Sequence, residues 1–169
     1  MEPEYELSRD LENGYLFVNG ERIFAIRIKT YQAFIDHLKA VRGKSVSTVL
    51  CDQIGKSMGH AAMAFWKNRV HRVEDVWKLG DEVFSHQGCG RLLGAEERVE
   101  GGTRKFIVRC RGTPISYERN AAEPTCDVMR GFVQGWVETY LEKAAASSTE
   151  TQCESMGSSE CVFEVTFVQ

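Results

Sequence analysis

The sequence lacks a hydrophobic run long enough to cross a bilayer, because its longest apolar stretch, Ala61–Trp66, is followed directly by Lys67. It also lacks the basic start of an export or organelle-targeting signal, since residues 1–6 are acidic. The formal net charge is only −3, without the basic excess of a dedicated nucleic-acid binder. These absences predict a cytoplasmic protein with no membrane span and no direct nucleic-acid partner.

The 169 residues have the composition of one globular domain. Hydrophobic residues make up 43% of the chain, so it can bury a core and is not mainly disordered. No internal repeat and no linker divides it. We expect a single domain over residues 1–169, in which residues 1–44 form an N-terminal hairpin and helix that serve dimerisation, and residues 45–168 form the core.

The N-terminal part predicts a β-hairpin followed by a helix. Residues 15–18 and 22–28 flank Asn19-Gly20, a dipeptide that supplies the positive φ angles of a tight turn. The acidic segment 1–12 contains few apolar residues and is expected to fray. The helix should have Thr30 as its N-cap and end at Gly43.

Two more helices are expected before the middle of the chain. The first begins at Ser45 or Ser47 and runs to about Asn68, and Gly55 and Gly59 would let another backbone approach it closely. Its apolar face comprises Val46, Leu50, Ile54, Met58, Ala61, Ala62 and Phe65. The second helix, residues 73–86, would turn inward Val76, Trp77, Gly80, Val83 and Phe84.

The C-terminal half predicts two hairpins on either side of an amphipathic helix. The first hairpin joins residues 91–100 to 104–111, the helix covers residues 125–143, and the second hairpin joins 149–153 to 161–168. Hairpins that alternate with helical blocks indicate an α+β domain, an antiparallel sheet with helices packed on it.

Six cysteines in a chain without an export signal argue against a disulfide scaffold. An antiparallel hairpin would bring Cys153 and Cys161 together, and Cys126 falls in the first helical turn, where free N–H groups favour a thiolate. Glu150 would join them only if the strand is bulged, because three residues separate it from Cys153. Spacing alone leaves two alternatives open, a tetrahedral zinc site and plain burial of the thiols. The other three cysteines, Cys51, Cys89 and Cys110, are most simply packing residues.

Two runs of the sequence resemble the 4-vinyl reductase domain family, whose ending reads E-x-x-C-x-x-x-G-x-x-x-C-x-F. They are Cys126-Asp-Val-Met-Arg-Gly-Phe-Val-Gln-Gly135 and Glu150-Thr-Gln-Cys-Glu-Ser-Met-Gly-Ser-Ser-Glu-Cys-Val-Phe163. The resemblance is specific over residues 126–165 and loose over 45–112. It implies a fold similar to subunits of the vesicle-tethering transport particle and to haem–nitric oxide sensors. It also implies a zinc ion held by Cys126, Glu150, Cys153 and Cys161.

In the phenol-sensing members of that family the zinc lies close to a buried aromatic-ligand pocket. The resemblance therefore implies a hydrophobic small molecule as partner. The candidate lining residues, which could equally fill the core, are Trp77, Phe84, Phe106, Phe132 and Trp136. Those sensors hold the phenol hydroxyl with a His and a Trp, whereas the corresponding regions here contain Trp77 and Lys105-Phe106, so the polar pair is not reproduced.

Three functions follow as hypotheses. We expect a zinc-containing, non-catalytic module that binds or senses a hydrophobic or aromatic ligand. A reductase or accessory protein in tetrapyrrole metabolism is the alternative that the family's name suggests, but the sequence shows no G-x-G-x-x-G fingerprint, flavin site or Fe–S spacing. A homodimeric scaffold, with the hairpin of residues 15–28 at the interface, is a third hypothesis based on fold analogy.

Overall fold

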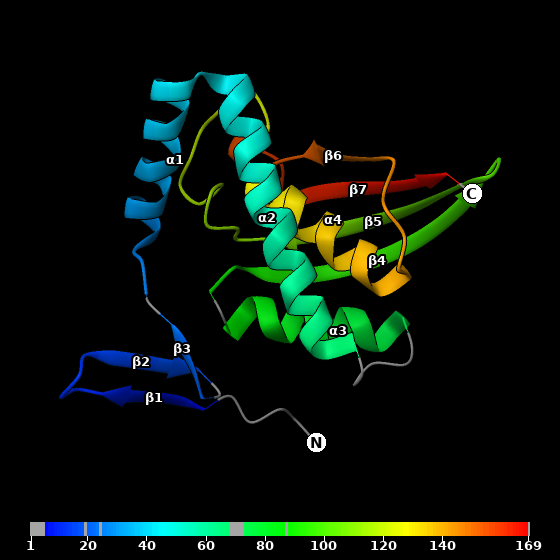
Figure 1. Ribbon diagram of the computed structural model, residues 1–169. Helices are drawn as coiled ribbons and strands as arrows, with labels where there is room; N and C mark the ends of the chain where they lie inside the picture. Colours follow the sequence, from blue (N-terminus) through cyan, green and yellow to red (C-terminus); the bar gives the residue numbers. More distant parts are fainter. Residues whose placement is uncertain (1–5, 19, 24, 68–72, 87, 169) are drawn as a thin grey trace.

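The computed structural model describes residues 6–18, 20–23, 25–67, 73–86 and 88–168. These residues form an α+β fold of two antiparallel sheets and packed helices, as the sequence predicts (Figure 1). The small sheet stands apart from the large one in Figure 1, and α1 (Ile28–Arg42) leads from it to the rest of the chain. No helix among the described residues has the length and hydropathy to span a membrane.

The small sheet is a meander of β1 (Leu7–Asp10), β2 (Tyr15–Val18) and β3 (Glu21–Ile23). The hairpin of β2 and β3 is confirmed, although Asn19 of its turn lies outside the described residues and β3 ends at Ile23. The expectation that residues 1–12 fray is wrong, because β1 pairs with β2. The Asp10 carboxylate accepts hydrogen bonds from the backbone and side-chain nitrogens of Asn13, and so it closes the connecting turn.

Gly43 separates α1 from α2 (Lys44–Trp66). Its φ of +77° suits glycine and ends α1 where the sequence predicts it. The N-termini of both helices differ from expectation. Helix α1 begins at Ile28 after Arg27, not after Thr30, and α2 begins directly at Lys44. Neither helix has a side-chain cap at its start, so capping residues were poor guides here.

Helix α2 crosses α4 (Asp127–Leu141) through four glycines, Gly55 and Gly59 of α2 and Gly131 and Gly135 of α4. A Cβ atom at Gly55 would lie 1.9 Å from the carbonyl oxygen of Val128, and one at Gly131 would lie 2.0 Å from that of Asp52. The two backbones are therefore in direct contact, and the close approach predicted from Gly55 and Gly59 is confirmed.

The expected inner face of α2 is wrong. Of its predicted apolar residues, Val46, Leu50, Ile54 and Met58 are between 42% and 52% exposed, and the side chain of Phe65 lies outside the described residues. The helix instead buries small residues together with Met63, namely Ser47, Cys51, Gly55 and Gly59. Backbone contact through glycines selects the buried side, and the larger aliphatic side chains are turned outward.

The large sheet has the strand order β4-β5-β7-β6, from β4 (Arg91–Glu100), β5 (Thr103–Arg111), β6 (Ser147–Gln152) and β7 (Cys161–Val168). Helix α4 packs on β6 and β7, α2 packs on α4, and α3 (Val73–His86) packs on β4. The predicted alternation of β7 is confirmed, since its inward side chains are almost fully buried: Cys161, Phe163, Val165 and Phe167. The core thus lies between this sheet and the helices, and α4 runs through it.

Candidate metal centre and neighbouring cavity

Four side chains that are far apart in the sequence meet at one end of α4. Cys126 is the N-cap residue of α4, Glu150 lies on β6, Cys153 precedes the short 3-10 helix η2 (Glu154–Met156), and Cys161 begins β7. The register of β6 against β7 shifts between Glu150 and Gln152. This is the strand irregularity that the spacing of Glu150 and Cys153 requires, and it turns both side chains toward the same point.

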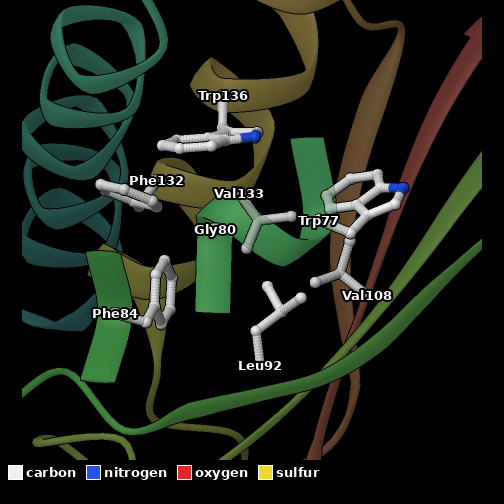
Figure 2. A pocket seen from close by; sticks show the side chains of 8 residues that line it. All are labelled: Trp77, Gly80, Phe84, Leu92, Val108, Phe132, Val133 and Trp136. Atoms are coloured by element: carbon white, nitrogen blue, oxygen red, sulfur yellow. The ribbon is translucent and has the colours of Figure 1, made fainter. Parts of the chain in front are cut away.

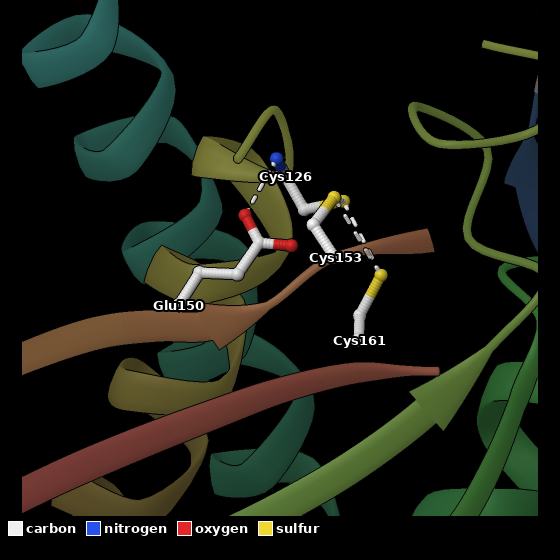
Figure 3. A group of neighbouring side chains, drawn as sticks. All are labelled: Cys126, Glu150, Cys153 and Cys161. Carbon is white, nitrogen blue, oxygen red and sulfur yellow. Dashed lines mark hydrogen bonds between the residues drawn. The ribbon is translucent and has the colours of Figure 1, made fainter. Parts of the chain in front are cut away.

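The geometry of this cluster matches a tetrahedral metal site (Figure 3). The sulfur of Cys126 lies 3.8 Å from those of Cys153 and Cys161, which are 4.0 Å from each other. One ligand atom from each residue, including a Glu150 oxygen, lies within 4.8 Å of all the others. Metal–sulfur bonds of about 2.3 Å in a tetrahedron place the sulfurs about 3.8 Å apart. The cluster could therefore hold a metal ion.

Glu150 contributes a second sign of a ligand site. One carboxylate oxygen, Oε2, accepts a hydrogen bond of 2.9 Å from the backbone nitrogen of Cys126. The other oxygen, Oε1, is buried and has no hydrogen-bond partner in the described part of the chain. Figure 3 shows this second oxygen turned toward the sulfurs. Because buried carboxylate oxygens are normally paired, an unpaired one beside three thiols fits a role as metal ligand.

The protein alone stabilises only part of the charge that these ligands would carry. Burial raises the pKa of Glu150 to about 8, with the neighbouring Cys153 adding to the effect. The pKa of Cys126 lies well above its usual range, because its thiol is hydrogen-bonded to Cys153. The pKa of Cys153 is lowered, because it accepts hydrogen bonds from the thiols of Cys126 and Cys161. Without a cation the cluster thus retains protons, and a divalent ion would replace them.

The remaining cysteines lie outside this cluster. Cys51 and Cys110 are fully buried and Cys89 is half-buried, and none forms a disulfide. Cys110 of β5 is paired with Cys161 across the strands, yet it is not among the four clustered residues. Burial raises the pKa of the Cys110 thiol, which keeps it neutral.

A small apolar cavity lies beside the middle of α4 (Figure 2). Four of the five predicted pocket residues line it, Trp77, Phe84, Phe132 and Trp136, together with Gly80, Leu92, Val108 and Val133. Phe106 is not part of the lining; it is buried in the core and packs against Trp77 and Phe167. The cavity volume is about 10 Å³, roughly the room for one water molecule.

The cavity wall contains one unsatisfied polar group. The indole nitrogen of Trp136 is buried and has no hydrogen-bond partner among the described residues. The other lining side chains are carbon only, apart from Trp77, the half-buried member of the set. Sequence reasoning missed Val108, although its position two residues after Phe106 on one strand would have placed it on the same sheet face. The cavity thus offers an apolar surface and a donor.

Comparison with known proteins places this arrangement in a family. The model of the vinyl-4-reductase domain family matches residues 106–167, a segment that includes all four clustered residues. No curated protein sequence matches the chain.

Three solved structures share the fold. The phenol-responsive sensory domain of the transcription activator PoxR, solved with phenol, has a TM-score of 0.76 at 15% identity, covering 95% of this chain and 84% of that chain. A vinyl-4-reductase family protein from Methanocaldococcus jannaschii has a TM-score of 0.54 at 18% identity, over 85% and 82%. Trafficking protein particle complex subunit 3 from Naegleria fowleri, covalently bound to palmitic acid, has a TM-score of 0.55 at 13% identity, over 84% and 95%. The family that the sequence resembles is thereby confirmed, and the chain belongs to the vinyl-4-reductase domain family through residues 106–167.

Proposed function

We propose that this protein is a zinc-containing module that binds a small hydrophobic molecule and is not an enzyme. The observation that carries the proposal is the set of three buried sulfurs 3.8–4.0 Å apart with an unpaired carboxylate oxygen beside them. Thiolate ligands in a tetrahedral arrangement favour zinc over magnesium or calcium, which prefer oxygen. Free thiols at all six cysteines suit a reducing compartment such as the cytoplasm.

The donor set argues for a structural or sensory metal. Cys126, Glu150, Cys153 and Cys161 supply four protein ligands, so a bound zinc ion has no open position for an activated water molecule. A reductase in tetrapyrrole metabolism would need an electron donor, and the sequence contains no recognisable nucleotide fingerprint for one. Zinc here would neutralise the ligands and join α4 to β6 and β7.

The cavity sets the chemistry of the proposed ligand. Its aromatic and aliphatic wall suits an apolar body, and the unpaired indole N–H of Trp136 suits one hydrogen-bond acceptor on that body. The structural relative PoxR was solved with phenol, a molecule of this description. A ring does not fit into about 10 Å³, so binding requires lining side chains to move, and the half-buried Trp77 is best placed to do so.

Native mass spectrometry with elemental analysis of untagged protein tests this function. We expect one zinc ion per chain and a mass shift when phenol or benzene is added at millimolar concentration. Absence of stoichiometric metal would contradict the zinc proposal. Absence of any bound or bindable apolar molecule, with zinc present, would contradict the ligand proposal alone.

Replacing Trp136 with Phe should separate the donor from the apolar wall. The Trp136→Phe variant keeps a ring in the wall but loses the indole N–H, so we expect phenol to bind about 10-fold more weakly, the worth of one hydrogen bond. Benzene, which has no acceptor, should bind the variant and the wild type alike. Equal weakening for both probes in calorimetry would show that the residue acts through packing only.

A second proposal, the homodimer, is favoured by two uncovered surfaces. The outward face of α2 contains Val46, Val49, Leu50, Ile54 and Met58, which are between 42% and 59% exposed. The charged groups of the middle of α2 face α4 instead, because Asp52 pairs with Arg130, and Lys56 pairs with Glu138. The outward face is therefore apolar and uncharged, and a second copy of the same face can meet it without charge repulsion.

The small N-terminal sheet is the other uncovered surface. Leu7 is paired with Val18 and Leu16 with Ile23, so one face of the meander gathers these aliphatic side chains, and none of the described residues of this sheet is buried. A three-stranded sheet needs its apolar face covered to be stable. We infer that both surfaces are covered in a two-fold dimer.

Replacing Ile54 with Glu should disrupt this dimer. The charge would lie at the middle of the outward face of α2, facing its counterpart, and we expect light scattering to report a monomer where the wild type is a dimer. The matched control is Val99→Glu on β4, because Val99 is also exposed but lies on another element. A wild type that is monomeric at high concentration would contradict the proposal.

A further inference from the structure

A buried threonine lies beside the metal centre and outside the four ligands. Thr113 follows β5 and is fully buried. Its Oγ1 atom lies 3.3 Å from the sulfur of Cys126 and 2.6 Å from the hydroxyl oxygen of Ser116. A buried hydroxyl must be satisfied by such partners, so Thr113 is held by these two contacts.

The chemistry of a loaded centre decides which way these hydrogen bonds run. A metal-bound Cys126 thiolate has no proton and can only accept, so the Thr113 hydroxyl donates to it. The oxygen of Thr113 then accepts from Ser116, since each hydroxyl has one proton to donate. Glu154 remains satisfied, because both of its carboxylate oxygens accept from the backbone nitrogen of Gly112, at 2.9 and 3.0 Å.

The other two sulfurs already have donors of their own. The hydroxyl of Ser155 lies 3.1 Å from the sulfur of Cys153, and the backbone nitrogen of Glu154 lies 3.4 Å from that of Cys161. Three thiolates and one carboxylate around a divalent ion leave excess negative charge, which such donors stabilise. In the described part of the chain, Thr113 is the hydroxyl placed at the third sulfur, Cys126.

The turn that carries Thr113 also anchors α1. The side-chain amide of the buried Gln32 donates to the carbonyl oxygens of Pro114, at 2.9 Å, and Tyr117, at 2.8 Å. Arg119, just beyond the turn, donates to the Asp36 carboxylate at 2.6 Å. A change in the position of Thr113 would therefore be transmitted through residues 114–119 to α1.

We propose that Thr113 is a positioning residue of the metal centre: its hydroxyl donates to metal-bound Cys126, and its turn links the centre to α1. This inference rests on the proposed metal site, but it concerns a residue outside the ligand set. Removing the hydroxyl leaves the four ligands in place and takes away a hydrogen bond to one of them. Loss of such an outer partner weakens metal binding by about 10- to 100-fold.

The test compares Thr113→Val, which is nearly isosteric, with Thr113→Ser, which keeps the hydroxyl. Zinc affinity by chelator competition should fall about 10-fold or more in Thr113→Val and stay near the wild-type value in Thr113→Ser. The sulfur-to-metal absorption band of the cobalt-substituted protein should shift only in the valine variant. Hydrogen exchange of α1 should quicken there as well. Thr139→Val, on α4 away from the cluster, is the control for loss of a buried threonine hydroxyl.

The outcomes separate this inference from the proposed function. If the wild type binds no metal, the proposed site fails as a whole. If Thr113→Val binds zinc and cobalt as the wild type does, Thr113 is a packing residue and the inference is overturned. If Thr113→Val does not fold, Ser116→Ala decides, because it removes the group that orients Thr113. Reduced zinc affinity in that variant supports the inference, and unchanged affinity overturns it.

Discussion

Replacing Cys153 or Cys161 with serine is expected to remove the bound zinc and most of the stability of the C-terminal half. Each sulfur is fully buried and lies at the end of a strand that the metal would join to α4. Binding energy at a structural zinc site is folding energy, so losing a ligand forfeits several kcal/mol. In a chain of this size a loss of about 5 kcal/mol lowers Tm by about 10–20 °C. Elemental analysis and thermal unfolding measure both effects.

The control for these variants is Cys110→Ala. Cys110 is equally buried and is paired with Cys161 in the strand register, but it contributes no atom to the cluster. We expect it to cost some packing energy and to retain a full equivalent of zinc. Removing the metal from the wild type with a strong chelator should reproduce the serine phenotype. Serine variants with wild-type metal content and Tm would show that the four residues are merely packed together.

Replacing Gly131 with alanine is expected to destabilise the fold by more than about 3 kcal/mol, above the usual cost of overpacking. The new methyl group would lie 2.0 Å from the backbone oxygen of Asp52, and a backbone cannot turn aside as a flexible side chain can. The two helices would have to separate along a crossing built on four glycines. This cost outweighs the gain of about 1 kcal/mol that alanine brings to a helix. Chemical denaturation measures the difference.

Gly80→Ala is the matched control, because Gly80 is also a helical glycine. A Cβ atom there would meet only side-chain atoms of Leu92 and Trp136, both at an ordinary distance of 3.8 Å. We expect this variant to be as stable as the wild type, or more stable by up to about 1 kcal/mol. If Gly131→Ala were equally harmless, the close crossing of α2 and α4 would be wrong.

Local patterns accounted for much of the secondary structure. The predicted hairpin of β4 and β5, the helix α4 and the alternation of β7 all agree with the structure, because turn glycines and residue periodicity act over a few neighbours. The strand irregularity beside Glu150 was also predicted, since only a bulge could turn Glu150 and Cys153 to one point. The family resemblance named the four candidate ligands before the fold was known.

Contacts between distant segments decided the rest. Strand β1 forms although residues 1–12 have little apolar character, because β2 offers it a pairing edge. The aliphatic stripe of α2 lies outside because glycines on its other side meet the backbone of α4, a partner that helical periodicity cannot reveal.

The sequence by itself determined the α+β class, the helix and strand pattern of the C-terminal half and the residue types of the metal cluster. Only the tertiary structure decided which face of α2 is buried, that Phe106 lies outside the cavity, and that Thr113 reaches Cys126. The physical reason is range. Periodicity and turn chemistry are set by adjacent residues, whereas a shared cavity or a hydrogen bond between separate elements exists only once those elements have packed.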